Sequence, residues 1–262
     1  RPTGTEKAPL ATVKEFYQVK CPKCGSSARR ETDVSDAFVD SSWYFLRYPS
    51  VKDKKHPWDQ ATTKKWLPVD MYIGGAEHAV LHLLYSRFVT MAFNDWGMLD
   101  FEEPYKVFCT HGLITKDGAK MSKSRGNVVN PDEYINAYGI DAIRMYLAFL
   151  APLTQGGDFR DTGIRGMTRF LERVWKYGNS KLETLNSKQI QNSKSQIQKT
   201  LHKTIKKVTQ DLENLQYNTA ISALMTLLNE FEARKKEVTE GDWTTFLKLL
   251  APLAPFITEE LW

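Results

Sequence analysis

The sequence predicts an α/β fold followed by an all-α fold. Residues 69–110 show the pattern strand, Gly-Gly, helix, strand, which is typical of a parallel nucleotide-binding sheet. A lysine-containing loop bounded by glycines follows at residues 118–127. Beyond Gly157 the only periodicity is helical, with apolar residues at three- and four-residue steps. We therefore expect half of a parallel sheet at residues 37–158 and an antiparallel helical bundle at residues 159–262.

Composition sets broad limits on the function. The chain has 262 residues, of which 42% are hydrophobic, and a formal net charge of +5, which permits a nucleic-acid partner. No apolar run approaches the roughly 18 residues of a membrane span. Three cysteines are too few for a disulfide framework and fit a reducing compartment. We expect a soluble, cytoplasmic protein and, because the sequence starts at Arg1, a fragment of a longer one.

The lysine loop, residues 118–127, carries Lys120 and Lys123 between two glycines. Two mobile ammonium groups, the hydroxyls of Ser122 and Ser124, and free backbone N–H groups are suited to binding a polyphosphate. Glycine at each end allows such a loop to close over a ligand and reopen. The alternative is a solvated basic surface loop.

The first strand and helix are expected at residues 69–73 and about 76–94, joined by a turn at Gly74 and Gly75. This arrangement places backbone N–H groups and a positive helix end where nucleotides bind in open α/β folds. Glu77, in the first helical turn, can accept hydrogen bonds from a ribose. One buried apolar face is expected on this helix, formed by Val80, Leu83, Leu84, Phe88, Met91 and Ala92.

Two further groups of residues have several interpretations. His78 and His82 lie on one helix face and could bind a metal, be buried and hydrogen-bonded in the core, or line a substrate pocket. Their spacing does not match the His-Glu-x-x-His pattern of zinc proteases. The aromatic and hydroxyl-rich residues 38–47 could likewise line a small-molecule pocket or form core. Residues 49–66 are expected to be a loop.

The second strand, expected at residues 106–110, runs into His111 and Gly112. Two strands joined through a helix form a βαβ crossover, so we expect them to be parallel. Gly112 would allow the backbone to approach a flat ring closely. Short helices are expected at residues 131–139 and 141–150, and no strand is expected beyond Gly157.

The helical part begins with a basic helix at residues 162–177. Its cations have helical spacing and predict one stripe, which is either a solvated face or a tRNA contact: Arg165, Arg169, Arg173 and Lys176. Residues 179–200 are expected to be a mobile insertion or a frayed helix. Three helices should follow, the first with an apolar seam from Leu201 to Leu215, the second capped by Asn218 and the third starting at Asp242.

Residues 1–36 are expected to be a linker that carries half of a zinc ribbon, with a polar connecting segment over residues 1–20. Cys21 and Cys24 have the spacing that lets two thiolates bind one tetrahedral zinc, but no second pair is present. The alternatives are a half-site whose partner pair lies outside this sequence, a relic without metal, and a redox pair. Zinc is expected only if a second cysteine pair is supplied.

Several segments together resemble one family. Residues 120–124, KMSKS, match the signature of class I aminoacyl-tRNA synthetases. Residues 74–88, GGAEHAVLHLLYSRF, are similar to a segment of the leucyl-tRNA synthetases that differs in the valine and isoleucine enzymes. Further similar segments lie at residues 21–48, 202–209, 217–221 and 251–256. The resemblance implies the second half of a Rossmann-like catalytic domain and then an anticodon-binding bundle.

The resemblance also implies ATP-dependent activation of leucine, with ATP as its Mg²⁺ complex, and transfer to tRNA-Leu. It makes Lys120 and Lys123 the catalytic residues. It implies an adenylate site formed by Gly74, Gly75, Glu77, His78, His111, Gly112, Met121, Ser122 and Ser124. The leucine pocket would comprise Phe38, Ser41, Tyr44 and His82, and the tRNA contacts Arg165, Arg169, Arg173 and Lys176.

The sequence also departs from this family. It contains neither the HIGH motif nor an editing domain. We therefore expect the chain to be inactive alone unless the N-terminal half is supplied, for example as a separate chain. The alternative function is a non-catalytic tRNA-binding module derived from a class I synthetase, and a further one is a valine or isoleucine synthetase.

Overall fold

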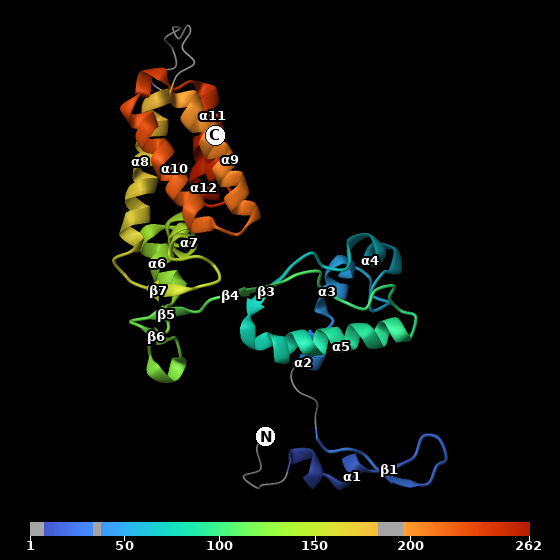
Figure 1. Cartoon of the computed structure of the whole chain (residues 1–262). Coiled ribbons are helices and arrows are strands. Elements are labelled where there is room, and N and C mark those ends of the chain that lie inside the picture. The colour runs from blue at the N-terminus through green and yellow to red at the C-terminus, as the bar shows by residue number, and fades with distance from the viewer. Residues whose placement is uncertain (1–7, 34–37, 183–195) are drawn as a thin grey trace. The chain divides into compact units, whose positions relative to one another are not determined.

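The computed structural model describes residues 8–33, 38–182 and 196–262, which form two compact units, Arg1–Cys109 and Thr110–Trp262 (Figure 1). Both contain helices and short strands, which confirms the α/β plus all-α fold class. No helix in the described part of the chain combines the length and apolarity that crossing a membrane requires.

The first unit contains a small hairpin near its N-terminal end. Strands β1 (Gln18–Lys20) and β2 (Ser27–Arg29) pair antiparallel around the Cys-x-x-Cys turn, after η1 (Pro9–Thr12) and α1 (Lys14–Tyr17). The predicted connecting segment therefore contains short regular elements in its described part, from Pro9 to Lys20.

The rest of the first unit packs around a small aromatic core that includes Phe45, Trp58 and Tyr105. The expectation of a loop throughout residues 49–66 is wrong, because Asp59 caps a helix by accepting a hydrogen bond from the Thr62 N–H. The elements in chain order are α2 (Phe38–Ser41), α3 (Tyr44–Arg47), η2 (Tyr48–Ser50), α4 (Gln60–Trp66), β3 (Tyr72–Gly75), η3 (Ala76–Val80), α5 (His82–Asp95) and β4 (Phe108–His111).

The predicted crossover is present. Strands β3 and β4 are neighbours, and Val69 and Tyr105 form a parallel bridge beside them. Two details of the prediction are wrong. Gly74 and Gly75 end the strand instead of forming a turn, and the helix is interrupted at Leu81, whose φ of −118° and ψ of −111° separate η3 from α5.

Helix α5 buries a different face from the predicted one. Its buried residues are His82, Ser86 and Thr90, whereas Phe88 is 67% exposed. The predicted apolar positions Val80, Leu84 and Met91 are exposed as well, although Leu83 packs on the aromatic core. Small polar side chains allow the helix to lie close to the aromatic layer, where Tyr105 donates to the Ser86 hydroxyl.

The second unit combines a three-stranded sheet with a helical bundle (Figure 1). The sheet order is β6-β5-β7, with β5 (Ile114–Lys116) antiparallel to β6 (Ala119–Lys120) and parallel to β7 (Gly157–Phe159). The expectation that no strand lies beyond Gly157 is therefore wrong. The helices are α6 (Pro131–Tyr138), α7 (Ile140–Phe149), α8 (Ile164–Leu182), α9 (Gln196–Glu213), α10 (Tyr217–Ala233), α11 (Glu240–Leu250) and α12 (Pro255–Leu261).

The bundle has one continuous apolar core, in which Val208, Leu224, Phe231 and Phe246 are fully buried. Two predicted caps are wrong. Helix α10 already begins at Tyr217, so Asn218 lies inside it, and Thr239 caps α11, with Asp242 completing a capping box. The insertion expected at residues 179–200 lies mostly outside the described residues.

Candidate functional site

The lysine loop grows out of a tight hairpin in the second unit. Strands β5 and β6 are joined by Asp117 and Gly118, with φ values of 53° and 73°. Positive φ at both central residues is typical of the two-residue turns that match strand twist, and Asp-Gly is a favoured sequence for them. The turn places Lys120 at the end of β6.

A carboxylate from the neighbouring strand holds this turn. Asp158 on β7 accepts hydrogen bonds from the Gly118 N–H at 2.8 Å and the Thr115 hydroxyl at 2.9 Å. These two bonds lower the pKa of the Asp158 carboxyl below its ordinary value. The turn is therefore attached to the rest of the sheet through a side chain as well as through backbone pairing.

A second carboxylate links the segments before and after the loop. Asp161 accepts from Lys116 on β5 and from the Tyr134 hydroxyl on α6. The same contacts lower the pKa of Asp161, raise that of Lys116 and raise that of Tyr134 to about 12. Both ends of the loop are thus fixed against the same side chain.

Within the loop, the two lysines point away from the core. Lys120 and Lys123 are exposed, whereas Met121 between them is half-buried and packs on the core of the unit. In the described part of the chain neither ammonium group forms an ion pair or hydrogen bond. Gly126, at φ 67°, ends the single 3-10 turn that carries Lys123. The loop therefore presents two cations that no described side chain or carbonyl engages.

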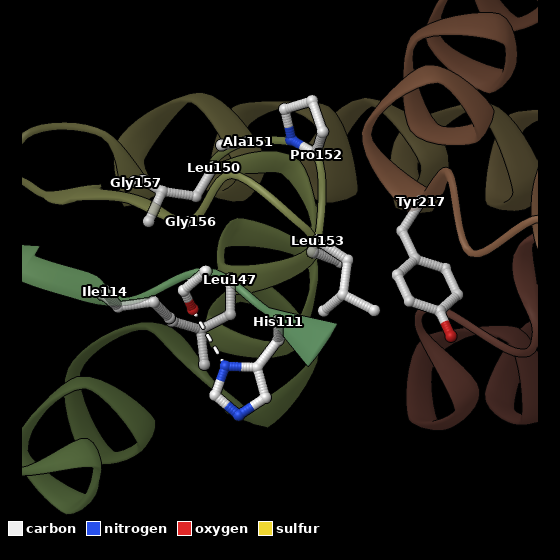
Figure 2. A pocket seen from close by; sticks show the side chains of 12 residues that line it. His111, Ile114, Leu147, Leu150, Ala151, Pro152, Leu153, Gly156, Gly157 and Tyr217 are labelled. Carbon is white, nitrogen blue, oxygen red and sulfur yellow. Dashed lines mark hydrogen bonds between the residues drawn. The ribbon is translucent and has the colours of Figure 1, made fainter. Parts of the chain in front are cut away.

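A cavity of about 230 Å³ lies beside the start of β5 (Figure 2). It is mostly apolar, with Leu147 and Leu153 in its wall, and Tyr217 reaches it from the start of α10. The His111 ring borders it and donates through Nδ1 to the Gly112 carbonyl at 2.9 Å. The size and lining of this cavity are compatible with a flat aromatic group.

Gly112 is required for a different contact from the predicted one. A Cβ atom there would lie 2.1 Å from the backbone of Gln155 and Gly156, which cross it closely. The backbone of Gln155 and Gly156 therefore fills the space beside the Cα atom of Gly112, and no open face is left there for a ring.

In the first unit, the predicted leucine-pocket residues lie together around His82. Its ring is 5.9 Å from that of Phe38 and 5.7 Å from that of Tyr44. His82 Nε2 donates to the Ser41 carbonyl at 3.0 Å, so in the neutral ring Nδ1 accepts from the Tyr72 hydroxyl at 2.9 Å. Both ring nitrogens of this buried side chain are hydrogen-bonded, so in this arrangement neither is turned toward a metal ion.

The predicted ribose-binding residues lie next to this cluster. The Glu77 carboxylate folds back over Gly75, where a Cβ would come within 2.3 Å of it, so any larger residue would displace this exposed side chain. His78 packs edge-on against Phe38, and its Nδ1 is buried with no hydrogen-bond partner among the described residues. The nucleotide-site residues are therefore divided between the two units.

The cysteine turn holds only part of a metal site. Cys24 is exposed, and its thiol lies 3.1 Å from the Ser26 hydroxyl, a contact that lowers its pKa. The described residues contain no group of three or more His, Cys, Asp or Glu side chains that could hold a metal. Two thiols alone do not complete a tetrahedral zinc site.

The expected cationic stripe on α8 is interrupted. Arg173 forms an ion pair with Glu232, with Nε 3.1 Å from Oε1, and also donates to Asn229 on α10. It joins two helices instead of facing a ligand, and the pairing raises its pKa. Arg165, Arg169 and Lys176 are exposed.

The sequence prediction did not identify Asp158 and Asp161. Gly118 lies 40 positions before Asp158, and Tyr134 lies 27 positions before Asp161, so no local sequence pattern indicates these contacts. Only the pairing of β5 with β7 brings them to the loop.

Comparison with known proteins decides the family. Residues 5–160, more than half of the chain, match the family described as tRNA synthetases class I (I, L, M and V). The chain belongs to the class I tRNA synthetases. In agreement with this membership, residues 194–262 match the anticodon-binding domain of tRNA ligase.

Similar members of the class I synthetases share the whole length of the chain. A leucine–tRNA ligase of Petrotoga mobilis is 46% identical over 278 residues, covering 100% of this chain and 33% of the relative. A leucine–tRNA ligase of Dehalococcoides mccartyi is also 46% identical, and the match covers 98% of this chain and 32% of that relative. The chain therefore spans about a third of the length of these curated relatives.

Solved structures agree. A ternary complex of LeuRS, tRNA and LeuAMS from Agrobacterium radiobacter K84 matches with a TM-score of 0.84 and 39% identity, covering 97% of this chain and 35% of that one. A second match is methionyl-tRNA synthetase of Mycobacterium tuberculosis in complex with methionyl-adenylate, with a TM-score of 0.65 and 18% identity. It covers 93% of this chain and 51% of that one, and at this identity it shows a likeness of fold alone.

Proposed function

We propose that this chain is the part of a leucine–tRNA ligase that carries the phosphate-binding loop and an anticodon-binding bundle. The observation that supports this most is the lysine loop, a carboxylate-anchored hairpin loop in a chain 46% identical to leucine–tRNA ligases. Its two lysines are exposed and form no ion pair with any residue the structure describes. The substrates would be leucine, ATP as its Mg²⁺ complex, and tRNA-Leu. Reduced cysteines are compatible with a cytoplasmic location.

In the proposed reaction, the leucine carboxylate attacks the α-phosphorus of ATP and pyrophosphate leaves. Negative charge then increases on the departing phosphates, and Lys120 and Lys123 stabilise it. Cationic donors positioned where charge develops lower the barrier more than they favour substrate binding. Transfer of the leucyl group to tRNA follows.

The remaining site residues are assigned on the same basis. Gly74, Gly75, Glu77, His78, His111, Gly112 and the loop residues Met121, Ser122 and Ser124 would surround the adenylate. The cluster formed by Phe38, Ser41, Tyr44 and His82 would border leucine. For tRNA we retain Arg165, Arg169 and Lys176, because these cations are exposed and none of them forms an ion pair with another described residue.

The intact enzyme would also cover the apolar side of α5. Phe88 is 67% and Leu84 51% exposed, and parallel sheets such as β3–β4 normally have both faces covered. We propose that the N-terminal half of the catalytic domain, within the same chain or as a separate one, packs there. A second cysteine pair from that part would be needed for zinc.

Amino-acid-dependent exchange of pyrophosphate into ATP tests the proposal. The intact enzyme that contains this chain should show exchange with leucine and much weaker exchange with valine, isoleucine or methionine. Preference for one of those three amino acids would contradict leucine specificity, and absence of exchange with all four would favour the non-catalytic module. The isolated chain should show none.

A further inference from the structure

The side chain of Asn127 lies across the lysine loop and is hydrogen-bonded to two points of its first half. Its Nδ2 group donates to the Lys120 carbonyl at 3.2 Å, and its Oδ1 accepts from the Ser122 N–H at 2.9 Å. A carboxamide has a donor and an acceptor side by side, so one side chain can satisfy two backbone groups of opposite kind. Asn127 is half-buried, which limits competition from water.

The two bonded backbone groups flank Met121, the residue that fixes the loop to the core. On one side is the carbonyl of Lys120. On the other is Ser122, whose hydroxyl accepts from the Arg125 N–H at 3.2 Å and contacts the Ser124 hydroxyl at 2.9 Å. Ser122 thereby starts the 3-10 turn that carries Lys123. The Asn127 amide is thus connected to the backbone of one lysine directly and to the turn of the other through Ser122.

We propose that Asn127 is a positioning residue that holds the lysine loop in one conformation, with Lys120 and Lys123 presented together. Its amide acts on the backbone and touches no ligand. What the loop binds rests on the function proposed above, whereas the ordering of the loop does not. Without the amide, the two lysines would sample independent positions, and a phosphate ligand would have to order them at the cost of affinity.

Tryptic cleavage of the whole chain provides the test, because the bonds after Lys120, Lys123 and Arg125 become accessible only when the loop opens. Asn127→Ala removes two hydrogen bonds, so we expect cleavage within the loop to accelerate roughly tenfold or more. Rates are measured by mass spectrometry and normalised to cleavage after Lys54, an exposed site in the other unit.

Two variants make the test specific. Asn130→Ala removes the nearby asparagine that caps α6 by accepting from the Asp132 N–H at 3.1 Å, and it should leave loop cleavage within about twofold of wild type. Asn127→Asp keeps an acceptor for the Ser122 N–H but loses the donor, so an intermediate rate is expected. A wild-type rate for Asn127→Ala, or equal acceleration by Asn130→Ala, would overturn the proposal.

Pyrophosphate serves as the ligand probe. Binding should slow loop cleavage, and the half-protecting concentration should rise several-fold in Asn127→Ala but not in Asn130→Ala. An unchanged concentration in Asn127→Ala would show a merely structural contact and overturn the positioning role. Failure of pyrophosphate to protect even the wild-type chain would count against the proposed phosphate site instead, and the cleavage rates without ligand would still decide whether Asn127 holds the loop.

Discussion

Single polar side chains with distant partners fix the regions around the candidate site. Asp158 and Asp161 hold the base of the lysine loop, and His82 joins segments 41 residues apart through Ser41. Asn127 does the same locally, since its partners lie five and seven residues away within the loop. Truncating any one of these side chains would leave its hydrogen-bond partner unsatisfied. For the buried His82, losing one hydrogen-bond partner costs about 1–3 kcal/mol, more than the bond contributes when intact.

The Tyr72 hydroxyl should stabilise the first unit through His82. Tyr72→Phe leaves the His82 Nδ1 atom without a donor, so we expect the free energy of unfolding of that unit to fall by about 1–2 kcal/mol. Denaturant unfolding measures the change. Tyr48→Phe is the control, because Tyr48 is 68% exposed and should change stability by less than about 0.5 kcal/mol. Equal effects of the two variants would contradict the assigned hydrogen bond.

Asp161 should make the second unit sensitive to acid. Its folded-state pKa lies below the ordinary value of 3.8 because Lys116 and Tyr134 donate to the carboxylate. The stabilisation is therefore complete above pH 3.8 and is lost as the pH falls through the lower folded-state pKa. Unfolding free energies measured from pH 6 to pH 3 should fall more steeply in wild type than in Asp161→Asn. Parallel curves for the two proteins would refute this contribution.

At the scale of elements, the sequence predicted helices that carry their own start and stop signals. Helix α6 begins after Asn130 at Pro131 and ends before Gly139, as expected. Strands β6 and β7 were missed because they are two and three residues long and exist only through pairing with β5. The buried face of α5 was predicted on the wrong side, because periodicity reveals two unlike faces but not which of them meets a neighbour.

The hairpin turn at the base of the lysine loop should depend on the backbone conformation of Gly118. At φ 73° a Cβ would meet no atom within 4 Å, so Gly118→Ala introduces backbone strain alone and should cost about 1–2 kcal/mol. Gly166 in α8 has equally open space without a positive φ, so Gly166→Ala should stabilise by about 0.5 kcal/mol. Thermal unfolding of both variants checks the difference in sign, and destabilisation of similar size in both would contradict it.

At the scale of the whole molecule, the two units have cores of very different size. The buried apolar residues of the first unit's core are Phe45, Leu46, Trp58, Leu99 and Tyr105, whereas the second unit buries residues from α7 through α12. The predicted site residues belong partly to the first unit, as Glu77 does, and partly to the second, as Lys120 and Lys123 do. Motif resemblance predicted the site residues. The contacts of Asp158 and Asp161 with Thr115 and Lys116 could not be predicted, because pairing between segments more than 40 residues apart creates them.

Unequal cores predict unequal stability. Because hydrophobic stabilisation scales with buried apolar area, the first unit should unfold at lower urea concentration than the second. Hydrogen exchange followed by mass spectrometry across a urea series should show α5 losing protection before α9 and α10. Loss of protection in all three helices at the same midpoint would indicate a single cooperative unit instead.

The lysine loop is the centre of the proposed function, and its two cations can be tested directly. Leucine-dependent ATP–pyrophosphate exchange by the intact enzyme should fall roughly 100- to 1,000-fold in Lys120→Ala and in Lys123→Ala. Lys106→Ala, which removes an exposed lysine paired with Asp70, should retain near wild-type exchange. Exchange rates in the two loop variants equal to that of Lys106→Ala would contradict the assignment of this loop to phosphate chemistry.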